Sequence, residues 1–147
     1  MTASSGGYQK NWEKLFLDTL GESLEAASNV KCMMMLAGFT PQYSTHEFVN
    51  AVTSEVSGTA YTAEGTTCAG NAIAWSTPNL SFDVTDPVWN SSYITNAAQA
   101  AYYTEVGATS ADQLHVNQDF GGAFTSTNGD FTIQEPGAGI WTIDLVI

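Results

Sequence analysis

The stretch IWTIDLVI at residues 140–147 shows the pattern that decides the fold. Every second side chain in it is large and apolar, whereas the positions between them include a threonine and an aspartate. A period of two is typical of a strand that buries one face. We therefore expect a strand that directs four side chains into the core, namely Trp141, Ile143, Leu145 and Ile147.

Similar runs precede this strand and are separated by turn residues. They are rich in threonine and aromatic side chains, which favour strands. The dipeptide Asn128-Gly129 between two apolar runs predicts a β-hairpin. Further strands are expected at residues 30–37, 67–75, 80–85, 97–105, 114–119 and 130–135.

Two helices are expected in the first third of the chain. Apolar side chains fall at helical spacing over residues 8–20, and they include Trp12, Phe16 and Leu20. This apolar stripe either packs on the protein's own sheet or docks on a partner. Ser44 followed by Glu47 is a capping-box pattern that predicts a second, short helix at residues 45–54.

Together these elements predict a mainly β (α+β) fold, an antiparallel β-sandwich or barrel-like module with an N-terminal helix and one further short helix. We expect a single domain over residues 1–147. Within it, residues 1–7 form a flexible tail, residues 8–25 a helical N-terminal arm and residues 26–147 a β-rich body.

The charge of the chain excludes several classes of partner. The chain has 15 acidic and 3 basic side chains, a net charge of −12, and all three cations are lysines. Such a chain is repelled by nucleic acid and by anionic lipid, so we expect neither as a partner. No apolar run reaches the length of a membrane-spanning helix.

No local motif indicates catalysis, a cofactor or a metal. His46 and Glu47 are neighbours on a predicted helix and point in different directions, and His115 stands alone in a predicted strand. Residues 1–7 lack the basic and apolar segments of a secretion signal. We therefore expect Cys32 and Cys68 to be reduced, buried thiols, and we do not expect an enzyme, a cofactor or a metal ion.

Two segments carry a resemblance to a known family. TPQYSTHEF at residues 40–48 and EVSGTAYTAEG at residues 55–65 are similar to the TP-x-x-x-THEF … NEVSGTGYTAGG signature of small tailed-phage virion proteins. The chain departs from that family at residues 96–103, where an Arg-Tyr-Ala strand is common, and at Glu105, where a lysine is expected. Shorter similar segments lie at residues 82–89, 92–95, 119–122 and 128–133.

The resemblance implies a virion protein that is made in the host cytoplasm and sits on the capsid surface. It implies a decoration (cement) protein that binds the major capsid protein, with a tail, baseplate or host-adhesion component as the alternative. We expect a homo-oligomer, either a dimer or a trimer. Aromatic and apolar anchors dominate interfaces, so the interface candidates are Trp12, Phe16, Leu20 and, in a predicted loop at residues 87–90, Trp89.

Overall fold

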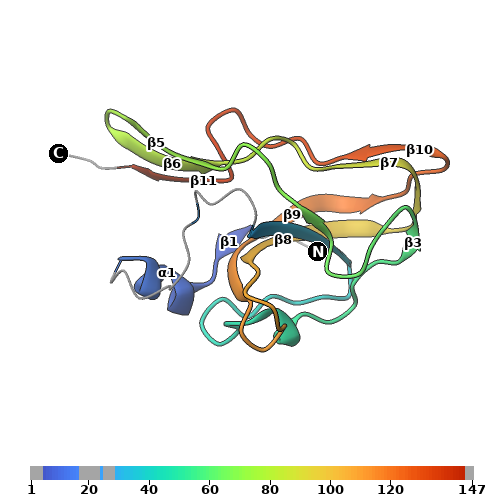
Figure 1. Ribbon diagram of the computed structural model, residues 1–147, viewed down its shortest axis with the longest axis horizontal. Helices are drawn as coiled ribbons and strands as arrows, with labels where there is room; N and C mark the ends of the chain where they lie inside the picture. The colour runs from blue at the N-terminus through green and yellow to red at the C-terminus, as the bar shows by residue number, and fades with distance from the viewer. Residues whose placement is uncertain (1–4, 17–23, 25–28, 145–147) are drawn as a thin grey trace.

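The computed structural model describes residues 5–16, 24 and 29–144, and the chain is mainly β (Figure 1). The elements in chain order are β1 (Gly6–Gly7), α1 (Gln9–Phe16), β2 (Val30–Leu36), the 3-10 turn η1 (Val49–Ala51), β3 (Gly58–Thr59), β4 (Thr66–Thr67), β5 (Ala72–Ser76), β6 (Asn79–Asp83), β7 (Val88–Ile94), β8 (Ala97–Thr104), β9 (Gln113–Phe124), β10 (Gly129–Thr132) and β11 (Trp141–Asp144).

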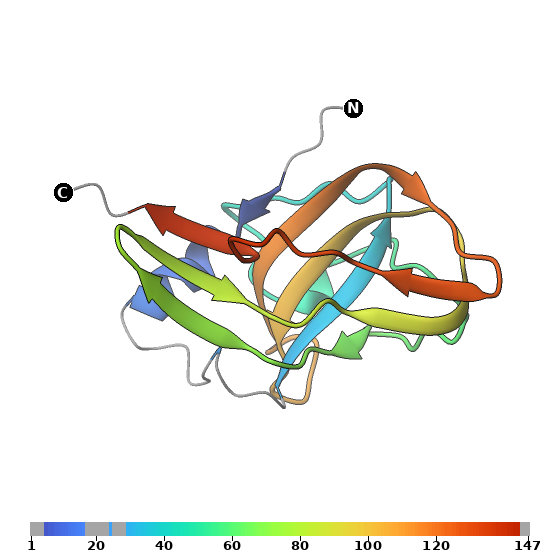
Figure 2. The same cartoon turned by 90° about the horizontal axis from the view of Figure 1, so that it is seen from above.

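The strands form three antiparallel sheets. A five-stranded sheet has the order β1-β9-β8-β2-β4, and a three-stranded sheet, β10-β7-β3, lies over one of its faces as in a β-sandwich (Figures 1 and 2). The third sheet, β11-β6-β5, extends beyond these two layers, and we call it the wing. The wing continues the upper layer, because β6 leads into β7 and β10 leads towards β11.

The five-stranded sheet is covered on both faces. Towards the upper layer it directs Met34 and Tyr102, which belong to a core cluster with Trp89. Towards the opposite face it directs Met33 and Met35, which pack in a second cluster under the segment that follows β2. All three methionines are at most 2% exposed. These methionines therefore fill the core, and the expected burial of the two free cysteines is confirmed.

The predicted helix at residues 45–54 is wrong. This segment contains only the three residues of η1, and its N-cap residue, Phe48, makes no side-chain capping hydrogen bond. Glu47 does not act as a capping-box residue. Its carboxylate pairs with Lys14, whose Nζ lies 2.5 Å from Oε1, and its carbonyl accepts a hydrogen bond from the Leu114 backbone N–H. These contacts hold the segment extended along β9.

Three further predictions differ from the structure. Residues 67–75 do not form one strand but supply the end of β4 and most of β5 in different sheets, because Gly70 turns the chain at φ +65°. The dipeptide Asn128-Gly129 does not close a hairpin, since β10 pairs with β7 rather than with β9. Gly6 and Gly7, placed in the predicted tail, form β1 against Asn117 and Val116.

The N-terminal helix is described as far as Phe16, so the predicted residues 17–20 lie outside the described residues. Its buried face packs on the body of the protein. Tyr8, next to its first turn, and Asn11 are both 0% exposed, and the Asn11 amide donates hydrogen bonds to the carbonyls of Glu47 and Leu114. The described part of the apolar stripe therefore faces the protein's own sheet.

Candidate functional site

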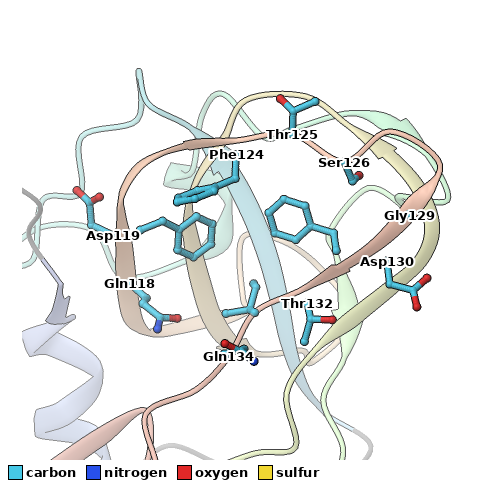
Figure 3. Close-up of a pocket in the computed structure, with 12 residues that line it drawn as sticks. Gln118, Asp119, Phe124, Thr125, Ser126, Gly129, Asp130, Thr132 and Gln134 are labelled. Carbon is cyan, nitrogen blue, oxygen red and sulfur yellow. The ribbon is translucent and has the colours of Figure 1, made fainter.

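A cavity lies on the side of the sandwich where β9 and β10 diverge (Figure 3). It has a volume of about 700 Å³. Its walls are residues 118–120 at the bend of β9, residues 124–126 at the corner between the two layers, and residues 129–134 of β10 and the chain that follows. We call this cavity the β9–β10 groove.

The groove exists because β9 bends out of its sheet. Gln99 of β8 pairs with Asp119, but the next pair along is Ala97 with Phe124, so four residues of β9 bulge outward. Gly121 lies at φ +73° in this bulge, a conformation that glycine adopts without steric cost. Its N–H donates to Oδ1 of Asp119 at 2.8 Å, which fixes the bend.

Two strand edges at the groove lack a neighbouring strand within the described part of the chain. β9 pairs with β8 on both sides of the bulge, whereas on its other edge β1 pairs with it only at Val116 and Asn117, and the Asp119 N–H donates to Ser5 Oγ. β10 is the end strand of its sheet and pairs with β7 alone. Unpaired edges present backbone N–H and C=O groups that can bind another extended chain.

The groove has an apolar floor and an acidic rim. The rings of Phe120 and Phe124 meet edge to face at 6.3 Å, and Phe124 is 53% exposed. Phe131 packs at 6.4 Å against Trp89 and so connects the floor to the core. Figure 3 shows the Phe124 ring directed into the groove, with the carboxylates of Asp119 and Asp130 on opposite sides of it.

The lysines are engaged elsewhere. Lys10 and Lys14 of α1 both pair with Glu47, and Lys31 of β2 pairs with Glu105, its Nζ lying 2.6 Å from Oε1. None of the lysines lines the groove. The residues that line the groove therefore include two aspartates and no lysine.

Of the four interface candidates, the structure describes the side chains of Trp12 and Trp89. Trp12 is partly buried, its Nε1 donates to the His115 carbonyl at 3.1 Å, and its ring packs 5.3 Å from that of Trp141. Trp89 is only 4% exposed and lies in β7, so its predicted loop position is wrong. Leu20 and the side chain of Phe16 lie outside what the structure describes.

The titratable groups of the core serve packing and hydrogen bonding. Burial lowers the pKa of His115 to about 4, and its Nε2 lies 2.6 Å from the Thr104 hydroxyl. Burial also raises the pKa of the Cys68 thiol to about 12, which suppresses the reactive thiolate. No group of three or more histidine, cysteine, aspartate or glutamate side chains that could hold a metal occurs among the described residues.

Glu135 is the titratable residue that sequence reasoning missed. It lies between β10 and β11, and its carboxylate accepts a hydrogen bond from the hydroxyl of the buried Tyr102. Burial raises the pKa of Glu135 to about 7, and the nearby carboxylates of Asp86 and Asp83 add to the shift. Only the three-dimensional fold brings Glu135 to Tyr102, so no local signal was available.

No family model, curated protein or solved structure matches this chain. Among the helices that the structure describes, none is long and apolar enough to cross a membrane.

Proposed function

We propose that the protein is a structural component of a phage virion, a capsid decoration protein that binds the major capsid protein and stabilises the mature head. The observation that carries this proposal is the β9–β10 groove, in which two unpaired strand edges flank an exposed aromatic floor. The resemblance of residues 40–48 and 55–65 to tailed-phage virion proteins supports it from the sequence.

In this proposal, an extended segment of the capsid protein lies in the groove. Its backbone hydrogen-bonds to the open edge of β10, and its apolar side chains contact Phe120, Phe124 and Phe131. Asp119 and Asp130 favour a segment that also carries lysine or arginine. Many copies, each held by one such contact, stabilise a shell through avidity.

The net charge of −12 is compatible with this location. A decoration protein lies outside the shell, where packaged DNA is separated from it by the capsid wall. Acidic charge at that surface favours solubility and costs little attraction to the shell when the docking segment is basic.

The first test is the copy number of this chain in purified virions, relative to the major capsid protein. A decoration protein is expected at a ratio near one or at a simple fraction of it, because it repeats with the capsid lattice. A handful of copies per particle would instead assign the protein to the tail or baseplate. Absence from the particle would overturn the virion proposal.

A second test locates the contact. Phe124→Ala removes an exposed ring of the groove floor, and aromatic anchors contribute about 2 kcal/mol at interfaces, so binding to purified capsids should weaken by about 30-fold. Val106→Ala is the matched control, because Val106 is apolar, 43% exposed and outside the groove. Equal binding by both variants would show that capsid contacts lie elsewhere.

A further inference from the structure

The wing has one polar face and one apolar face. Its register places Ile73, Phe82 and Trp141 side by side across the three strands, followed by a second row of Trp75, Leu80 and Ile143. The first row joins the core, where Phe82 stacks on Trp141 at 6.0 Å. In the second row, Leu80 and Ile143 are partly buried against the same core, but the end residue Trp75 is 64% exposed.

The outer edge of the wing is β5, and it carries no charge. β5 ends the strand order of its sheet and lies at the margin of the wing in Figure 2. Residues 65–82, which contain β5 and its turn to β6, include no charged side chain in a chain of net charge −12. Natural edge strands are usually protected by charge, a bulge or a covering element.

We propose that β5 pairs with β5 of a second copy of this chain, antiparallel and centred on Ala74, to join two wings into one six-stranded sheet. This register is symmetric, as a two-fold interface requires. It sets Ile73 of each copy directly opposite Trp75 of the other on the apolar face. Each exposed Trp75 ring is then covered by a β-branched side chain, and the apolar rows of the two wings become continuous.

The absence of charge at this edge favours a second copy of the chain over a basic partner segment as the occupant. Two chains of net charge −12 repel each other wherever their carboxylates meet, and at 0.1 M salt that repulsion decays over about 10 Å. At the β5 edge the side chains that meet on the polar face are Ala72, Ala74 and Ser76, so no carboxylate faces another across the interface. A basic partner segment would gain nothing at this edge. The pairing does not depend on whether the protein binds a capsid.

The test is the molar mass of the purified full-length protein across a concentration series, measured by light scattering. The wild type is expected to reach twice the mass of the chain. Ala74→Glu places two carboxylates at the symmetry axis, and Trp75→Ala removes the cross-strand contact, so both should lose the dimer at concentrations where the wild type is dimeric. Ala138→Glu, the same change at an exposed alanine off the edge, should remain dimeric.

Circular dichroism of each variant separates loss of pairing from loss of folding, and the exposed position of Ala74 makes unfolding of Ala74→Glu unexpected. A wild type that stays monomeric throughout would overturn the proposal. A dimer that survives Ala74→Glu would place the interface elsewhere, and a trimer would exclude an isologous β5 pair. If the protein stays monomeric and Trp75 becomes protected only on capsids, the β5 edge binds another chain and the proposed self-pairing is wrong.

Discussion

The wing continues the upper layer of the sandwich, yet the two regions bury their side chains differently. In the sandwich, every residue of β8 is buried, because a layer covers each face of the five-stranded sheet. In the wing, four of the five residues of β5 are exposed, since β6 is its only neighbouring strand among the described residues. The comparison assigns stability to the sandwich and leaves apolar surface available for association in the wing.

Side-chain size explains part of this difference. β8 reads AAQAAYYT, and its alanines allow the neighbouring layers to approach closely. Gln99, the polar residue in that run, is satisfied inside by donating to the Phe39 carbonyl at 2.9 Å and accepting from the Asn117 amide at 3.0 Å. The wing instead alternates alanine or polar residues with large apolar ones, which builds one apolar face without a second layer to cover all of it.

The largest effect is expected in the sandwich. Met34→Ala removes a side chain that is 0% exposed, and such truncations cost about 2–5 kcal/mol of unfolding free energy. Urea denaturation followed by far-UV circular dichroism measures the loss. An effect below about 1 kcal/mol would mean that the layers close around the cavity, contrary to the rigid core that the comparison assumes.

A pH-dependent effect is expected at the junction between the two regions. The pKa of Glu135 is raised from its ordinary 4.5 to about 7, so the folded state holds the proton more tightly than the unfolded chain does. The stabilisation from protonation is complete below about pH 4.5 and is lost as the pH rises to 7. Glu135→Gln keeps an acceptor for the Tyr102 hydroxyl and removes the titration.

The melting temperature of Glu135→Gln should therefore exceed that of the wild type by an amount that grows between pH 4.5 and 7. Glu13→Gln is the control, because Glu13 is an exposed carboxylate on α1. Parallel curves for the wild type and Glu135→Gln across that window would contradict the assignment.

A smaller effect is expected where α1 supports the wing. Lys14→Met breaks the ion pair with Glu47, a partly buried contact whose loss costs about 1 kcal/mol or less. Because Trp12 of α1 packs on Trp141 of β11, the loss should appear as faster proteolysis near α1 and the wing. Lys10→Met removes a longer, more exposed contact to the same carboxylate and should change less. Equal protection of both variants would show that the ion pair is not needed for docking.

The smallest effect on stability is expected in the wing. Trp75→Ala removes a larger side chain than Met34→Ala does. Because Trp75 is 64% exposed, however, the unfolding free energy of the monomer should change by about 0.5 kcal/mol or less. The measurement is urea denaturation at a concentration where the protein is monomeric. A loss comparable to that of Met34→Ala would remove the distinction between sandwich and wing.

Strong local patterns were read correctly from the sequence. The alternation at residues 140–147 is confirmed over the described part, where Trp141 is buried and Thr142 and Asp144 are exposed. The run at residues 30–37 forms β2, and its methionines are core residues. Both patterns depend on neighbours within the same strand, which is why they survive without knowledge of the fold.

The sequence predictions failed where contacts made through the fold determine the local structure. Glu47 is recruited by Lys14, 33 residues away in sequence, and this contact overrides the capping pattern. β7 was missed because its Asn-Ser-Ser centre resembles a loop, and a register shift opposite β10 breaks its alternation. The β9–β10 groove is lined by one stretch of chain, residues 118–134, but its shape depends on how that stretch bulges against β8 and then joins a second sheet.

The two buried cysteines allow transient opening of the sandwich to be measured by thiol labelling. Cys32 and Cys68 lie in the core between the layers, and burial raises the pKa of each thiol. A thiol-modifying reagent can therefore react only during transient opening of the core, and the labelling rate becomes a clock for that opening. This measurement needs no introduced probe. It would show whether occupation of the groove or pairing of the wings slows the transient opening of the core.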